Sequence, residues 1–112
     1  MHLRDIQVQA WQTAEDKGFH AHLAALPPRE QALIRLALIH TEVSECAQEV
    51  KRRGVTPETR PALAEELADT IIRIADLAGC LTVDLDLAVQ RKLAINAQRP
   101  MHYGTPREER AP

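Results

Sequence analysis

Residues 38–50 read LIHTEVSECAQEV and residues 65–79 read EELADTIIRIADLAG. Both segments repeat apolar residues every three or four positions, which is the spacing of an α-helix, and neither alternates at period two as a strand would. Each segment also carries two acidic residues three positions apart. The two segments therefore predict two helices that hold acidic side chains within a mainly apolar sequence.

Glycine and proline residues divide the remainder of the chain and predict two more helices. Gly18 and Gly54 each follow an apolar periodic segment, and Asp84 stands where an N-cap is expected. Residues 19–26 lead to the pair Pro27-Pro28 and are expected to form a loop. We expect helices over residues 3–17, from Pro27-Pro28 to about 53, from between Pro57 and Pro61 to about 78, and from 85 to about 98.

These helices predict an all-α fold, an antiparallel bundle of about four helices that forms one domain over residues 1–104. No segment alternates at period two, so no strand is expected. Residues 105–112 are polar and contain proline, which predicts a disordered tail. The third helix is apolar over well more than the ~100° stripe of a surface helix. We therefore expect a homo-oligomer, either a homodimer or a homotetramer, that buries this helix between copies.

The composition excludes several classes of protein. The net charge is −2, which gives no concentrated basic face for nucleic acid, and no apolar run approaches the ~20 residues of a membrane span. The N-terminal sequence does not have the pattern of a signal peptide. Cys46 and Cys80 lie in apolar helical patterns without CxxC spacing, which predicts two reduced core thiols. We expect a cytoplasmic protein that binds neither nucleic acid nor membrane.

The first acidic group lies within an apolar part of its helix. Glu42, Glu45 and Glu49 fall within about 60° of one another, with apolar residues on both flanks and the other polar residues opposite. A solvated charged face would have the reverse arrangement. Because burial of an unpaired charge is very costly, these carboxylates need a partner. Basic side chains from elsewhere in the chain could supply it, but a cation is the simpler candidate.

The second acidic pair, Glu66 and Asp69, has two interpretations. It is either the one solvent-exposed face of an apolar helix, with Asp69 and Arg73 as an ordinary i,i+4 ion pair, or half of a metal-binding site. Glu-x-x-Glu and Glu-x-x-Asp on neighbouring antiparallel helices can face each other. Four converging carboxylates make a hard oxygen cage that suits Mg²⁺ or Mn²⁺, and such a site most often serves phosphate chemistry.

The fourth helix carries a group that complements an acidic metal site. Lys92, Asn96 and Arg99 are spaced four and three apart and therefore share one face. Two cations and an amide donor suit the oxygens of a polyphosphate. The alternative is a solvated helix end, where cations are favoured near the C-terminus.

In this order, the motifs resemble the MazG-like branch of the all-alpha nucleoside triphosphate pyrophosphohydrolases. The resemblance rests on residues 38–50 and 65–79 and on DLDLAVQRKLAINAQRPMHYG at 84–104, with a weaker echo in KGFH at 17–20. It implies hydrolysis between the α and β phosphates, which gives the monophosphate and pyrophosphate, with Mg²⁺ essential and Mn²⁺ as a substitute.

The resemblance also implies roles for individual residues. Carried over by position, the metal ligands are Glu42, Glu45, Glu66 and Asp69. The phosphate and sugar contacts are Lys92, Asn96, Arg99 and Tyr103. We expect Glu45 to orient or deprotonate the attacking water.

Two departures from the family limit this transfer. The connection over residues 53–63 lacks insertions that could recognise a base, and Tyr103-Gly104 stands where many relatives have His-Gly. Two alternatives remain, a phosphoribosyl-ATP pyrophosphohydrolase-like enzyme and a catalytically silent helical interaction module. The sequence does not reveal the preferred base, and because no set of buried polar groups for base recognition is evident, we expect broad use of triphosphates.

Overall fold

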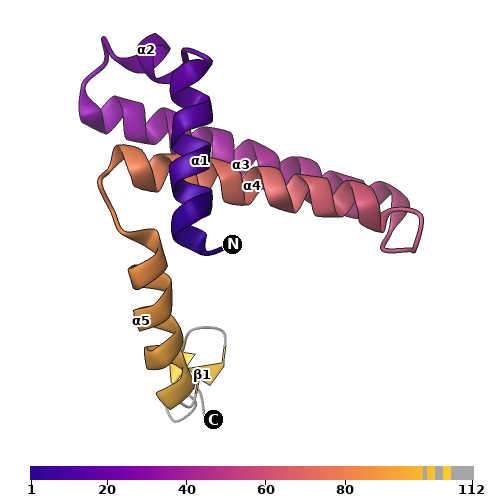
Figure 1. Cartoon of the computed structure of the whole chain (residues 1–112). Coiled ribbons are helices and arrows are strands. Elements are labelled where there is room, and N and C mark those ends of the chain that lie inside the picture. Colours follow the sequence, from indigo (N-terminus) through magenta and orange to yellow (C-terminus); the bar gives the residue numbers. More distant parts are fainter. Residues whose placement is uncertain (100, 103–104, 107–112) are drawn as a thin grey trace.

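The computed structural model describes residues 1–99, 101–102 and 105–106 of the chain, and these form five helices and two very short strands (Figure 1). The helices are α1 (Leu3–Asp16), α2 (Phe19–Leu23), α3 (Pro28–Arg53), α4 (Arg60–Cys80) and α5 (Leu85–Gln98). The strands β1 (Met101–His102) and β2 (Thr105–Pro106) pair antiparallel. The all-α fold class is confirmed. The two strands were not predicted because two residues are too few to show an alternating pattern.

Helices α3 and α4 form a long antiparallel hairpin, which α1 crosses (Figure 1). The connection between them is closed by Thr59, a buried residue. Its Oγ1 donates a hydrogen bond to the Gly54 carbonyl at 3.0 Å and accepts one from the Thr56 amide at 2.9 Å. Gly54 ends α3 with φ 73°, a left-handed conformation that glycine adopts at no steric cost. This tight connection holds the two helices side by side, which positions their acidic pairs.

Small residues allow α1 to lie close to α4. Ala10 of α1 and Ala75 and Ala78 of α4 are buried. At Gly79 the approach is closer still, since a Cβ atom there would lie 2.9 Å from Cδ1 of Trp11. The crossing of α1 and α4 therefore depends on the absence of a side chain at residue 79.

Helix α2 forms where a loop was expected, so that prediction was wrong. Gly18, with φ 80°, makes the left-handed turn between α1 and α2, and Leu23 of α2 is buried. Five residues span little more than one helical turn and show no apolar period, so packing rather than sequence pattern decides this element.

Helix α5 is held near its start and extends away from the α3–α4 hairpin (Figure 1). Asp84 is its N-cap, as predicted, and accepts a hydrogen bond from the Leu87 amide at 3.0 Å. The Gln7 side chain of α1 donates to the Val83 carbonyl at 2.8 Å and accepts from the Leu85 amide at 3.2 Å. No residue of α5 is buried. The bundle expected from the sequence is thus an α1–α3–α4 body from which α5 projects.

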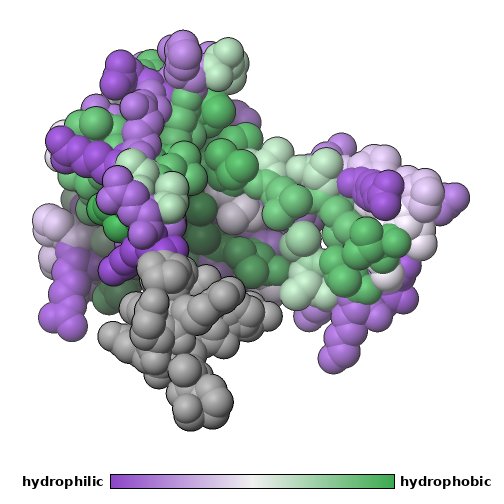
Figure 2. Space-filling view, turned by 90° about the horizontal axis from the view of Figure 1, so that it is seen from below, coloured by the Kyte–Doolittle hydropathy of each residue, from purple (hydrophilic) through white to green (hydrophobic). Residues whose placement is uncertain are grey.

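The chain exposes much apolar surface. Its Cα radius of gyration is 17.0 Å, whereas a compact domain of this length has about 13 Å. Leu67 of α4 is 57% exposed and Leu93 of α5 is 63% exposed. Figure 2 shows apolar side chains gathered over the body and along the hairpin. An apolar groove of about 450 Å³ lies between α1 and α4, where Ile6, Ile71 and Ile72 line it.

Two further expectations can be compared with this structure. Among the described residues, no helix combines the length and the hydropathy that a membrane span requires. Cys46 and Cys80 are free thiols, but neither is a core residue, because Cys46 is half-buried and Cys80, the last residue of α4, is exposed. The apolar pattern was misleading for Cys80 because it does not determine how fully the neighbouring helices cover the last turn of α4. The expected tail of 105–112 lies outside the described residues, except for Thr105–Pro106.

Candidate functional site

Three of the predicted metal ligands lie together between α3 and α4. Glu42 and Glu45 of α3 and Glu66 of α4 each offer a carboxylate oxygen, and these atoms lie within 4.8 Å of one another. The spacing of three places Glu42 and Glu45 on one face of α3, and the antiparallel hairpin brings Glu66 opposite them. Glu42 is buried, Glu66 is half-buried and Glu45 is exposed. We call these three residues the carboxylate cluster.

The carboxylate cluster concentrates negative charge. Burial raises the pKa of Glu66 above its ordinary value, and the neighbouring charges of Glu45 and Glu42 raise this pKa further. One carboxylate oxygen of Glu66, Oε2, is buried and has no hydrogen-bond partner among the described residues. A buried acceptor without a donor is costly, and a divalent cation would satisfy it and neutralise the repulsion. The donor set, which consists only of carboxylate oxygens, fits Mg²⁺ or Mn²⁺.

Arg73 of α4 reaches across to α3. Its Nε donates a hydrogen bond to Glu42 Oε1 at 2.8 Å. The sequence offered Arg73 as an i,i+4 partner of Asp69, but Glu42 is the carboxylate that it pairs with. This ion pair orients one oxygen of Glu42. The place of Arg73 in the site could not be predicted from the sequence, since pairing across two helices leaves no local signal.

Asp69 lies one turn along α4 from Glu66. Its charge also contributes to the raised pKa of Glu66, so the two carboxylates are near each other. Asp69 is exposed and is not one of the three residues whose ligand atoms lie within 4.8 Å of one another. The structure therefore brings together three of the four predicted ligands and places the fourth beside them.

Two cavities adjoin the carboxylate cluster. The larger, of about 720 Å³, lies where α1, α2, α3 and α4 meet, and its wall includes Glu42, Asp69 and the cations Lys17 and Arg73. The smaller, of about 370 Å³, is lined by Glu45 and Glu66 together with Arg52 and Arg53. Both volumes fall within the range of small-molecule sites. A ligand that carries phosphates would find cations on both sides of the carboxylates.

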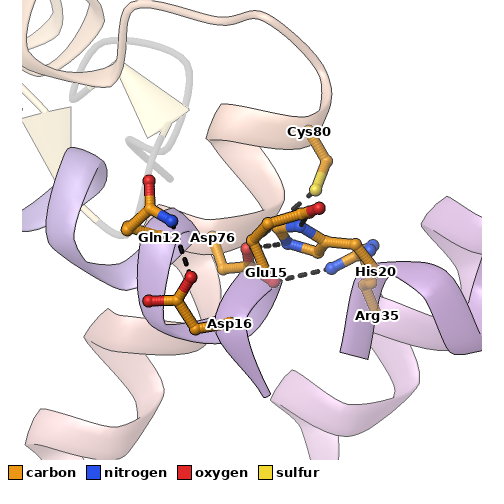
Figure 3. A network of polar contacts seen from close by, with 7 residues as sticks. All are labelled: Gln12, Glu15, Asp16, His20, Arg35, Asp76 and Cys80. Atoms are coloured by element: carbon orange, nitrogen blue, oxygen red, sulfur yellow. Dashed lines mark hydrogen bonds and ion pairs between the residues drawn. The ribbon is translucent and has the colours of Figure 1, made fainter. Parts of the chain in front are cut away.

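A second polar network joins α2 to α1, α3 and α4 (Figure 3). His20 Nδ1 lies 2.6 Å from Glu15 Oε2, and His20 Nε2 lies 2.7 Å from Asp76 Oδ1. Arg35 Nη1 donates a hydrogen bond to Asp76 Oδ2 at 2.6 Å, and the Arg35 guanidinium lies over the Phe19 ring at 5.0 Å. Asp76 belongs to the wall of the larger cavity.

Near this network, partial desolvation by the neighbouring residues raises the pKa of the exposed Cys80 thiol, and the negative charge of Asp76 adds to the effect. Of the network residues, His20 belongs to a segment that the sequence singled out, KGFH at 17–20, and Asp76 lies within residues 65–79. Residues 20 and 76 are far apart in the chain, so no spacing rule connects them.

The predicted phosphate contacts of α5 are not brought to the carboxylate cluster within one chain. Lys92 and Asn96 are exposed on α5, which extends away from the α3–α4 hairpin, and Arg99 is the exposed, extended residue that follows the helix (Figure 1). The fourth predicted contact, Tyr103, lies outside the described residues. The periodicity of α5 predicts that it is a helix but not which surface it packs against.

The chain is similar to human dCTP pyrophosphatase 1. The two are 39% identical over 104 aligned positions, which cover 80% of this chain and 61% of the relative. The chain thus spans about three fifths of the length of that protein. No family model matches the chain. No solved structure matches it either.

Proposed function

We propose that this chain is a MazG-like enzyme that hydrolyses nucleoside triphosphates to the monophosphate and pyrophosphate with Mg²⁺ as cofactor, and its likeness to dCTP pyrophosphatase 1 supports this proposal. The observation that carries the proposal is the carboxylate cluster beside a cavity of about 720 Å³, in which a buried Glu66 oxygen has no hydrogen-bond partner within the described part of the chain. The biological role that fits this chemistry is cleansing of the nucleotide pool. We propose a cytoplasmic location for this role.

The residues that would hold Mg²⁺ are Glu42, Glu45 and Glu66, with Asp69 beside them. A bound divalent cation would supply charge neutralisation for the phosphates and would make water a better nucleophile. Arg73 fixes the position of Glu42 through the 2.8 Å hydrogen bond from its Nε. Glu66 Oε2 is buried without a hydrogen-bond donor among the described residues, so this side chain would gain the most from a bound ion.

The chain's own residues would bind the substrate and move a proton. Glu45 is the exposed carboxylate of the cluster, and it can accept a proton from the water that attacks the α-phosphorus as the bond from that atom to the bridging oxygen breaks. Lys17 and Arg73 in one cavity and Arg52 in the other can donate to phosphate oxygens. Pyrophosphate would then leave with the bridging oxygen.

We further propose a homodimer, or a dimer of such dimers, in which α5 of a second copy approaches the carboxylate cluster. The exposed apolar residues of α4 and α5, Leu67 and Leu93 among them, support such an assembly. The projection of α5 from the body supports it as well (Figure 1). In the assembly, Lys92, Asn96 and Arg99 of the second copy would contact the phosphates, and Tyr103 the sugar.

The test is release of pyrophosphate from a panel of canonical, deoxy and modified triphosphates, with and without Mg²⁺ or Mn²⁺. We expect metal-dependent release and a loss of about 10²–10⁴-fold in kcat for Glu45→Gln, the range for a general base. Glu65→Gln is the matched control, because Glu65 is an exposed glutamate on α4 outside the cluster, and it should keep full activity. Absence of release from every triphosphate would reject the proposal and favour a silent interaction module.

A further inference from the structure

A second group of possible metal ligands lies at the end of α4, apart from the carboxylate cluster. His20 of α2 and Asp76 and Cys80 of α4 each offer one ligand atom, and these atoms lie within 4.8 Å of one another. Asp76 and Cys80 are four residues apart and so share one face of α4. Figure 3 shows the three side chains converging from the two helices.

The donor atoms of this group differ in kind from those of the carboxylate cluster. An imidazole nitrogen, a carboxylate oxygen and a thiolate sulfur are the three ligand types of zinc sites in proteins. Mg²⁺ prefers oxygen ligands alone, and thiolates favour softer ions. The chemistry of the group therefore selects zinc over magnesium.

The surrounding hydrogen bonds are those that orient metal ligands. Glu15 Oε2 lies 2.6 Å from His20 Nδ1, which directs Nε2 towards Asp76. A carboxylate on the far nitrogen of a ligating histidine is the common arrangement in zinc sites. Arg35 Nη1 holds Asp76 Oδ2 at 2.6 Å, which leaves Oδ1 to face His20 and Cys80.

The present distances need only small changes to admit an ion. Tetrahedral zinc with ordinary bond lengths would separate its nitrogen and oxygen ligands by about 3.4 Å and its sulfur and oxygen ligands by about 3.6 Å. The observed separations are 2.7 Å from His20 Nε2 to Asp76 Oδ1 and 4.0 Å from Cys80 Sγ to the same oxygen. The first separation would have to grow by about 0.7 Å and the second to shrink by about 0.4 Å.

The charges also balance. The thiolate of Cys80 and the carboxylate of Asp76 together neutralise a divalent ion, while Arg35 and Glu15 next to them carry opposite charges. On binding, the Cys80 thiol would release its proton to solvent as the metal–sulfur bond forms, and the proton held between His20 Nε2 and Asp76 Oδ1 would leave as these two atoms bind the metal.

We propose that His20, Asp76 and Cys80 form a site for a zinc-like transition metal that ties α2 to the end of α4. Solvent would complete the coordination, since Cys80 is exposed. This site is separate from the carboxylate cluster and does not depend on the proposed activity. It would stabilise the wall of the larger cavity, to which Asp76 and Phe19 belong.

Co²⁺ is the probe, because a thiolate bound to Co²⁺ gives a charge-transfer band in the near ultraviolet that oxygen ligands do not give. We expect the band on titration of the purified chain with Co²⁺, and its loss on addition of Zn²⁺. Cys80→Ser and His20→Gln should abolish it. Cys46→Ser, which removes the other thiol, and Glu45→Gln, which alters the carboxylate cluster, should retain it.

Thermal unfolding provides the second measurement. At a hundredfold excess of Zn²⁺ over its Kd, the melting temperature of the wild-type chain should rise by about 10 °C, and that of Cys80→Ser should not rise. Cys80→Ser should fold, because residue 80 is exposed. A wild-type chain without the band, or a band that survives Cys80→Ser and disappears in Cys46→Ser, would overturn the proposal. A chain that fails to hydrolyse triphosphates would contradict the proposed activity but not the proposed zinc site.

Discussion

Replacement of Asp76 with asparagine tests the buried network most directly. Asp76 and Arg35 are 7% and 4% exposed, and a 2.6 Å hydrogen bond joins them. Asparagine keeps the shape but removes the charge, so the Arg35 guanidinium stays buried without a carboxylate. No other ion pair to Arg35 is formed among the described residues. Because removal of one partner of a buried ion pair costs about 3–5 kcal/mol, we expect a loss of that size.

The exposed pair Glu49–Arg53 is the matched control. Its hydrogen bond is also short, at 2.8 Å, but the Arg53 side chain is 58% exposed. Glu49→Gln should therefore cost only about 0.3–0.5 kcal/mol, as other exposed i,i+4 pairs do. In thermal terms, Asp76→Asn should lower the melting temperature by about 12–20 °C, whereas Glu49→Gln should lower it by about 2 °C.

Urea unfolding followed by circular dichroism, in chelator and at fixed protein concentration, measures both variants under the same conditions. Removal of both charges, in Asp76→Asn with Arg35→Met, should cost less than Asp76→Asn alone, since no unpaired charge then remains. Equal costs for Asp76→Asn and Glu49→Gln would refute the view that the Arg35–Asp76 pair holds α3 and α4 together at this point.

Four further results are expected. In chelator, wild-type stability should fall as the pH rises from the ordinary carboxyl pKa through the raised pKa of Glu66, because the folded state binds that proton more tightly; Glu66→Gln should lack this fall in thermal scans across pH. Arg99→Ala and Lys92→Ala should each lose at least about tenfold in kcat/KM while keeping the melting temperature within a few degrees; unchanged kinetics would restrict the site to the acids. Light scattering at a chain concentration of tens of micromolar should report a dimer or tetramer. Ile71→Glu, a substitution in the apolar groove, should weaken this association. Across the triphosphate panel, the highest and lowest values of kcat/KM should differ by less than about 100-fold. A thousandfold preference for one triphosphate would contradict this expectation.

Elements with a clear local pattern could be predicted from the sequence. The long apolar periods gave α1, α3, α4 and α5 to within a few residues, and Asp84 was identified as an N-cap because its side chain acts on the next turn. The close approach of Glu42, Glu45 and Glu66 followed from helical spacing and an antiparallel connection. Both properties are local or depend on a single short connection.

Contacts that depend on helix orientation could not be predicted. The pairing of Arg73 with Glu42 requires the rotation of α4 about its axis, and the sequence fits a pairing with Asp69 equally well. His20 meets Asp76 only because Gly18 turns α2 back onto the body. The exposure of Cys80 likewise depends on what covers the end of α4, which periodicity does not determine.

The close crossing of α1 over α4 has a consequence for laboratory evolution of this chain. A methyl group at Gly79 would lie 2.9 Å from Trp11, so alanine there would require α1 to move. Ala10, Thr13 and Ala14 of α1 form part of the wall of the larger cavity. A library of substitutions at residues 11 and 79 would therefore resize that cavity by displacing a whole helix, while the chemistry between α3 and α4 stayed intact. In a selection for bulkier substrates, the first improved variants should carry substitutions at this crossing and not at the residues that contact the ligand.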